Sequence, residues 1–148
     1  MTEIRDVLKE DLEQIYLIEE KTFLAPWKKE DILNDFNDNP FSHWAVITLQ
    51  SMVVGFYVYW HTFDSATIAQ IAVDPSYQGQ HYGSYLLEEL ISDCVAKKVR
   101  AITLEVRKTN EKALNLYLKY GFKTVTIKPN YYSNGDDAYY MVKELING

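Results

Sequence analysis

The sequence predicts a single-domain α/β fold: a mixed, mostly antiparallel twisted sheet with helices on both faces. The chain has 148 residues, and about 100–200 residues is the usual size of one domain. Its apolar residues change between strand-like and helix-like spacing along the chain. The resulting order, β-α-α-β-β-β-α-β-α-β-β, joins consecutive hairpins to two strand–helix–strand crossovers. Hairpins give antiparallel pairs and crossovers give parallel ones, so the sheet is mixed and covered by helices.

The first half of the chain supplies a strand, two helices and three further strands. Apolar residues at helical spacing predict a helix from Glu10 to Phe23, which Pro26 ends, and a shorter helix from Trp27 to Phe36. A tight turn at Gln50-Ser51 separates two runs rich in β-branched and aromatic residues, the pattern of a hairpin. The strands are expected at 3–7, 43–49, 52–60 and 66–73.

The second half alternates helices and strands. A helical pattern runs from Tyr82 to Lys97, and a second helix follows Asn110, whose side chain can cap its first turn. Gly121 stands where a residue of left-handed conformation commonly ends a helix. The strands are expected at 101–106, 122–127 and 138–145, with a turn-rich loop at 129–137 before the last.

Composition excludes several classes of protein. With 15 basic against 21 acidic residues, a net charge of −6, the chain lacks the positive surface that nucleic-acid binding needs and suits a basic partner better. Its single cysteine, Cys94, excludes an internal disulfide and a multi-thiolate metal site. No apolar run approaches the roughly 18 residues of a membrane span, and the start MTEIRDVLKEDLEQ has no apolar signal region. We therefore expect a cytoplasmic protein without metal, whose histidines His43 and His61 lack ligand partners.

The stretch IAVDPSYQGQHYGSYLL passes from a strand through an Asp-Pro turn into a helix. Gly79 and Gly83 bracket the helix entry, where backbone N–H groups and the positive end of the helix dipole favour an anion such as phosphate. Two glycines near a helix start are a weak signal on their own. A plain strand-to-helix turn would carry the same residues.

Residues Gln78 to Gly83 resemble the coenzyme-binding motif of the GCN5-related N-acetyltransferase (GNAT) superfamily, Gln/Arg-x-x-Gly-x-Gly/Ala. His81 replaces the first glycine of this motif, which predicts crowding of the phosphates or a strained φ angle. The resemblance implies that acetyl-CoA is the co-substrate, held at its pyrophosphate by backbone amides of this loop. The coenzyme contacts carried over are Ile71, Ala72, Val73, Gly79, Gln80, His81, Tyr82, Gly83, Ser84 and Asn110.

The stretch LEVRKTNEKALNLYLKYGFKTV resembles the superfamily's second conserved region, with Asn110 and the run Tyr117 to Phe122. Together with Asn130-Tyr131-Tyr132 and the early Pro26-Trp27, it is similar to the bacterial RimI type. Those enzymes acetylate the N-terminal alanine of a small-subunit ribosomal protein. The resemblance therefore implies a protein N-terminal peptide, basic in character, as the partner.

The same resemblance implies that Glu105 is the general base and Tyr117 the general acid. A protonated N-terminal amine, with a pKa of roughly 7.7–8.0, must lose a proton before it attacks, and a carboxylate at a strand end can accept it. A phenol can protonate the departing thiolate. Each residue also has an ordinary structural interpretation, Glu105 as a surface carboxylate and Tyr117 as a buried aromatic. Cys94 lies on an apolar helix face and is predicted to be a core thiol.

The sequence leaves alternatives for the function. The acceptor can be another protein N-terminus, a lysine side chain or a polyamine, all cations that an acidic surface attracts. A non-catalytic acyl-CoA-binding module is the rival from another class. The presence of both Glu105 and Tyr117 argues against it, since binding alone requires neither an acid nor a base.

Overall fold

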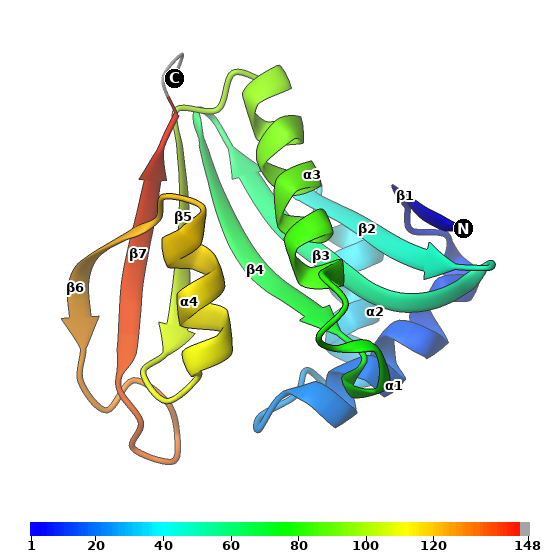
Figure 1. The fold of residues 1–148 in the computed structure, drawn as a ribbon, viewed down its shortest axis with the longest axis horizontal. Helices are drawn as coiled ribbons and strands as arrows, with labels where there is room; N and C mark the ends of the chain where they lie inside the picture. The colour runs from blue at the N-terminus through cyan, green and yellow to red at the C-terminus, as the bar shows by residue number, and fades with distance from the viewer. Residues whose placement is uncertain (146–148) are drawn as a thin grey trace. The chain divides into compact units, whose positions relative to one another are not determined.

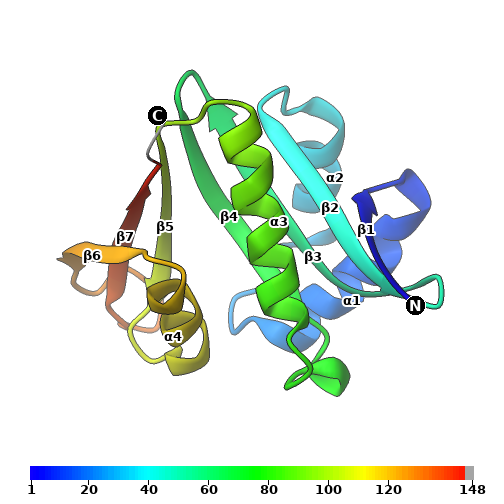
Figure 2. The same ribbon diagram turned by 45° about the horizontal axis from the view of Figure 1, so that its top comes forward.

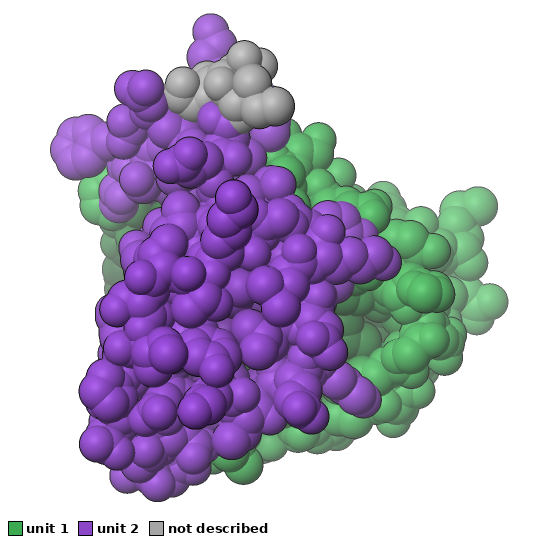
Figure 3. Space-filling view, turned by 60° about the vertical axis from the view of Figure 1, so that its left-hand side comes forward, with its two compact units in different colours: residues 1–60, 69–92 green, residues 61–68, 93–148 purple. Residues whose placement is uncertain are grey.

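The computed structural model describes residues 1–145 and divides into two compact units (Figure 3). Unit 1 comprises residues 1–60 and 69–92, and unit 2 comprises residues 61–68 and 93–148. Strand β4 (Ser65–Val73) contributes its first half to unit 2 and its second half to unit 1. Each unit is described by itself below.

Unit 1 is built on the strand order β1-β2-β3-β4. Strand β2 pairs antiparallel with both β1 and β3, as the predicted hairpin requires. Helices α1 and α2 lie on one face of these strands and α3 on the other (Figures 1 and 2). The remaining elements of this unit are β1 (Thr2–Asp6), a 3₁₀ turn (Lys9–Asp11), α1 (Leu12–Thr22), α2 (Lys29–Asp38), β2 (Ser42–Leu49), β3 (Met52–Thr62), a second 3₁₀ turn (Pro75–Tyr77) and the greater part of α3 (Tyr82–Ala96).

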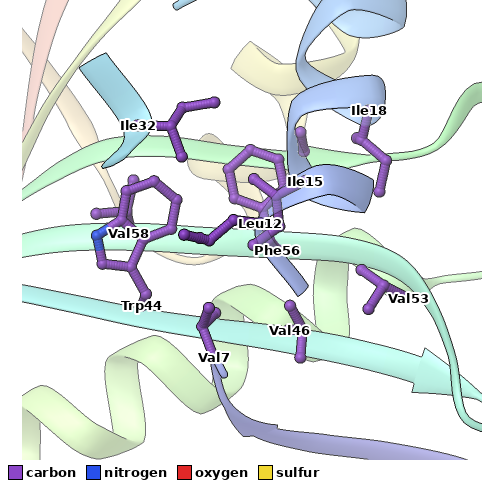
Figure 4. Packing of buried hydrophobic residues seen from close by; sticks show 11 residues of the cluster. Val7, Leu12, Ile15, Ile18, Ile32, Trp44, Val46, Val53, Phe56 and Val58 are labelled. Carbon is purple, nitrogen blue, oxygen red and sulfur yellow. The ribbon is translucent and has the colours of Figure 1, made fainter. Parts of the chain in front are cut away.

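The main core of unit 1 lies between α1, α2 and the sheet (Figure 4). At the β-bulge between Ile47 and Thr48 no β2 residue stands opposite Val54, so Val53 and Phe56 reach the same core although they are three positions apart. Burial of such side chains contributes about 1.5–3 kcal/mol each. The cluster comprises Val7, Leu12, Ile15, Ile18, Ile32, Trp44, Val46, Val53, Phe56, Val58 and Ala72.

The opposite face of unit 1 packs against α3, and Gly55 allows the close approach. A Cβ added there would lie 2.8 Å from the Ala72 carbonyl oxygen and 3.1 Å from side-chain atoms of Ile47 and Leu86. Backbone does not move aside as a flexible side chain does, so only glycine fits at this position. This contact holds β4 against β3 just before the strand-to-helix turn.

Unit 2 is built on the strand order β4-β5-β7-β6. Strand β5 pairs parallel with β4 and antiparallel with β7, and β7 pairs antiparallel with β6. Alternate residues of β5, namely Ile102, Leu104 and Val106, are buried, while Glu105 between them is half-buried. Both ribbon views show α4 beside β5 (Figures 1 and 2). The elements are β5 (Ala101–Arg107), α4 (Glu111–Lys119), β6 (Lys123–Lys128) and β7 (Ala138–Glu144).

The predicted fold class and order of elements are confirmed. Gln50 and Ser51 have φ angles of +50° and +70°, as a tight hairpin turn requires, and Gly121 has φ +89° at the end of α4. Two helix starts were predicted too early: α1 begins at Leu12 after a 3₁₀ turn, and α2 begins at Lys29. The prediction of a single domain stays a prediction. Within residues 1–145, no helix has the length and hydropathy to cross a membrane.

Candidate active site

The turn that follows β4 is held in place by one backbone hydrogen bond to β3 and by two of its own side chains. Asp74 donates its backbone N–H to the Val54 carbonyl at 2.8 Å, and its carboxylate accepts the Ser76 N–H at 2.9 Å. The Gln78 side-chain amide donates to the Val73 carbonyl at 3.3 Å. The chain therefore leaves the sheet along a defined path, which brings residues 79–84 to the start of α3.

Two residues of this loop adopt the left-handed conformation. Gly79 has φ +83° and His81 has φ +69°. His81 is exposed, and its carbonyl accepts the Tyr85 N–H at 3.0 Å, the first hydrogen bond of α3. An L-residue in this conformation is destabilised by roughly 1–2 kcal/mol relative to glycine. The strained φ predicted for His81 is therefore confirmed.

The start of α3 fits an anion. The backbone N–H groups of Tyr82, Gly83 and Ser84 have no partner within the helix, and the first turn carries no acidic side chain. A helix N-terminus of this kind attracts negative charge through its amides and its dipole. Around Gly79 there is open space, since an added Cβ would meet nothing within 4 Å. These residues fit the pyrophosphate of a coenzyme A.

The predicted strand contacts lie at the end of β4. Ala72 is buried, and Ile71 and Val73 are half-buried. The Val73 carbonyl accepts the Gln78 side chain, so its oxygen already has a hydrogen-bond partner. Whether these three residues contact the coenzyme stays a prediction.

Glu105 lies on the half-exposed face of β5, and both of its carboxylate oxygens are engaged. Its Oε1 accepts the Tyr131 hydroxyl at 2.8 Å, and its Oε2 forms an ion pair with the Lys128 ammonium. Across the β5–β7 pair Glu105 stands directly opposite Tyr140. We call Glu105, Lys128, Tyr131 and Tyr140 the Glu105 cluster. The Glu105 carboxylate is therefore held by defined contacts, unlike the isolated surface carboxylate of the ordinary structural interpretation.

The sequence analysis missed Lys128 and Tyr140. Tyr140 is opposite Glu105 on one side and opposite Thr126 of β6 on the other. Residues two apart in a strand share a face, so Lys128 lies on the same face as Thr126. Its ammonium is 5.4 Å from the Tyr131 ring centroid and 5.0 Å from that of Tyr140. Only the strand register, which the sequence does not specify, could have revealed this arrangement.

The β6–β7 loop is anchored beside this cluster by Arg107. The guanidinium lies 3.9 Å from the Tyr132 ring centroid and donates to Asp136 at 3.0 Å and to Asn134 at 2.9 Å. Burial raises the pKa of Tyr132, while the Arg107 charge lowers it. The hydrogen bond to Glu105 is the main cause that raises the pKa of Tyr131. Both phenols are therefore neutral at physiological pH.

Tyr117 is a buried residue of α4 and packs edge-on against Phe122, with ring centroids 5.6 Å apart. Burial raises the pKa of its phenol well above the usual value, and Tyr132 adds to the shift. The hydroxyl is therefore protonated at physiological pH. The charge of Glu105 in turn raises the pKa of Tyr132.

Asn110 caps α4, as predicted: its side-chain oxygen accepts the Ala113 N–H at 3.3 Å. Its predicted coenzyme contact stays a prediction. Cys94 is buried, in agreement with a core thiol. Among the residues described, no three His, Cys, Asp or Glu side chains gather as metal ligands would.

In chain order, a helix start suited to an anion is followed by a strand with a half-buried carboxylate and by a helix with a buried phenol, the order that the acetyltransferase resemblance implies. The model of the acetyltransferase (GNAT) family matches residues 10–122. The chain belongs to this family. It is an acetyl-CoA-dependent N-acetyltransferase. Of the two classes that the sequence left open, an enzyme and a non-catalytic acyl-CoA-binding module, the enzyme is confirmed.

Two relatives in sequence and one solved structure are similar to this chain over most of its length. A Bacillus subtilis (strain 168) protein is 36% identical over 139 residues, 93% of this chain and 92% of the relative. A ribosomal protein bS18-alanine N-acetyltransferase of Haemophilus ducreyi is 33% identical over 135 residues, 91% of this chain and 92% of the relative. The crystal structure of the ribosomal-protein-S18-alanine N-acetyltransferase from Escherichia coli superimposes with a TM-score of 0.90 at 33% identity, covering 97% of this chain and 94% of that one.

Proposed function

We propose that this enzyme transfers the acetyl group of acetyl-CoA to the N-terminal alanine amine of a small-subunit ribosomal protein, bS18. The observation that carries the proposal is the Glu105 carboxylate, half-exposed on β5 and in contact with a primary ammonium, that of Lys128. A site that holds this ammonium suits the chemistry of an amine acceptor. The relatives named for this reaction, which span more than nine tenths of the chain, support the choice of acceptor.

The coenzyme would be held by residues 79–84, whose backbone amides at the start of α3 suit its pyrophosphate. Bound acetyl-CoA supplies a thioester carbonyl for an amine to attack and a thiolate as the leaving group. Because the amides belong to the backbone, the His81 side chain does not remove them. A backbone N–H at the end of β4 would stabilise the oxyanion.

Glu105 would act as the general base. An N-terminal amine has a pKa of roughly 7.7–8.0, so near neutrality much of it carries a proton that it must lose before it attacks. The Glu105 carboxylate is accessible and fixed in position by the Tyr131 hydroxyl at 2.8 Å. It would accept the proton directly or through one water molecule.

Tyr117 would act as the general acid. Burial raises the pKa of its phenol, so the hydroxyl keeps its proton until the thioester bond breaks beside it. A departing thiolate, with an ordinary thiol pKa of roughly 8.5, is a weaker base than this phenolate. The transfer would therefore have to be coupled to bond breaking, so its effect appears only in the transition state.

The charge of the chain agrees with a basic peptide as acceptor. A net charge of −6 attracts peptides that carry arginine or lysine, mainly by speeding the encounter. We propose that the reaction takes place in the cytoplasm.

A thiol-release assay over a panel of acceptors tests this function. We expect turnover with a peptide that begins with alanine and carries downstream arginine or lysine, and none with the same peptide when its N-terminus is blocked. Free lysine and a polyamine serve as controls. Faster turnover with either control than with the free peptide would show that the acceptor is wrong.

A further inference from the structure

The Glu105 cluster already contains a primary ammonium group, and it comes from the chain itself. The Lys128 ammonium contacts the Glu105 carboxylate and lies within 5.4 Å of two aromatic ring centroids. A carboxylate combined with ring faces is a recurrent way to bind an ammonium ion, because both attract positive charge. The three residues Glu105, Tyr131 and Tyr140 therefore form a site for this chemical group.

Three elements position this site rather than one flexible loop. Glu105 is on β5 and Tyr140 is its direct partner on β7. Lys128 is the last residue of β6, paired with Ala138 of β7. Tyr131 follows in the loop, where its hydroxyl is fixed by the bond to Glu105. The carboxylate and the Tyr140 ring therefore hold their places whether or not Lys128 remains.

We propose that Lys128 occupies the site of the acceptor's ammonium group and that the acceptor must displace it. This inference rests on the proposed function. The acceptor's N-terminal ammonium carries the same charge and the same three N–H donors as the lysine. It can therefore take over the contact with Glu105 without leaving the carboxylate unpaired. Lys128 therefore competes with the acceptor for this site, and amines that bind the site weakly do not displace it.

The exposure of the pair makes this exchange feasible. The side chains of Lys128 and Glu105 are 41% and 28% exposed. An ion pair so accessible to water is weak, and a lysine stem can turn its ammonium into solvent at little cost. A buried pair would leave an uncompensated charge behind when broken. Lys128 can thus leave the site without disturbing the strands.

Lys128→Gln tests the proposal, with Lys123→Gln as the matched control. Lys123 is exposed at the other end of the same strand, opposite Val142, so its replacement removes the same charge. We expect Lys128→Gln to lower KM for the alanine peptide about five-fold, the scale of one exposed ion pair, with kcat little changed. Lys123→Gln should leave both constants near wild type.

A binding measurement separates this proposal from the proposed function. n-Butylammonium is titrated into isotope-labelled protein and followed by NMR, which requires no turnover. We expect it to bind Lys128→Gln more tightly than wild type or Lys123→Gln, with shifts at Glu105, Tyr131 and Tyr140. Thermal melts of all three proteins verify that they are folded.

The outcomes are distinct. If wild type acetylates the peptide but KM of Lys128→Gln is unchanged or raised, Lys128 does not compete and the proposal is wrong, while the function stands. If no N-terminal peptide is acetylated, the function fails and the n-butylammonium titration alone decides the proposal. Equal binding of n-butylammonium to all three proteins would overturn it.

Discussion

The loop at residues 79–84 and the Glu105 cluster are built on opposite principles. In the loop, the groups suited to a phosphate are backbone amides, which every residue except proline provides. In the cluster, the reactive groups are side chains from three strands and a loop, aligned by register. One region thus depends on backbone conformation and the other on residue identity.

This difference explains what each region tolerates. His81 stands in a position where the family motif has glycine, and the loop still adopts φ +69° there. His81 retains its backbone amide, and its strained conformation lowers only the stability of the protein. Replacement of Glu105 would remove the proton acceptor itself, and no backbone rearrangement can supply another. Substitutions should therefore change chemistry in the cluster and mainly stability or coenzyme affinity in the loop.

The largest effect is expected from Glu105→Gln. The change keeps the shape of the side chain and removes the base, so turnover near neutral pH should fall about 10²–10⁴-fold. Rate should partly recover at high pH, because the free amine then forms without help. Coenzyme affinity, measured by calorimetry, should not change. A variant with normal turnover would return Glu105 to the status of a surface carboxylate.

Tyr117→Phe should have the next largest effect. It removes one oxygen and retains the ring that packs on Phe122, so turnover should fall about 10²-fold while coenzyme affinity is retained. A donor with a more acidic thiol than coenzyme A should restore much of the rate. A variant that is destabilised by about 0.5–1.5 kcal/mol but fully active would exclude the general-acid role.

Glu19 contrasts with Glu105, because it is a carboxyl group with a structural role. It is fully buried on α1, where it accepts the Trp27 backbone N–H at 2.8 Å and the Gln70 side-chain amide at 2.7 Å. Burial raises its pKa above the ordinary value near 4.5, although both hydrogen bonds act in the other direction. The folded protein therefore binds this proton more tightly than the unfolded chain does.

The sign of the pH dependence follows from this shift. Between the ordinary value and the raised pKa the folded state holds the extra proton, so the contribution of Glu19 to stability is lost as pH rises. Glu19→Gln cannot titrate, so its stability relative to wild type should increase with pH across that range. Denaturant unfolding of both proteins over a pH series measures the difference. A constant difference would show that Glu19 does not titrate there.

The smallest effect is expected in the loop. His81→Gly relieves the positive φ angle, but glycine loses more conformational freedom on folding, so the net stabilisation should be up to about 1 kcal/mol, with coenzyme binding equal or tighter. Gly79→Ala is the matched control, since φ +83° strains any side chain although nothing lies within 4 Å. It should be destabilised. Weaker coenzyme binding by His81→Gly would mean that the imidazole itself contacts the coenzyme.

Local sequence was sufficient for most of the fold. Turn and cap residues act within a few positions, so the hairpin at Gln50-Ser51 and the cap at Asn110 were predicted correctly. The start predicted for α2 was two residues too early, because Lys28 is its extended N-cap residue (φ −74°, ψ 156°) and donates its N–H to the Asp31 carboxylate at 3.3 Å. The bulge at Val54 depends on pairing with β2, which no local pattern reports.

The loop and the Glu105 cluster likewise differ in how much of each the sequence predicts. The loop could be predicted because its function resides in a short run of backbone, and the strain at His81 followed from its position in the motif. Glu105 and Tyr117 were predicted from the family resemblance. Their surroundings were not: Tyr140 reaches Glu105 through register, and Lys128 reaches it across two strand pairs.

The most direct test of the central claim is the position of the acetyl group on the product. Wild-type enzyme, acetyl-CoA and a peptide that begins with alanine and contains an internal lysine are incubated, and the product is sequenced by tandem mass spectrometry. We predict the acetyl group on the N-terminal amine, with the lysine unmodified. Acetylation of the lysine while the N-terminus remains free would contradict the account.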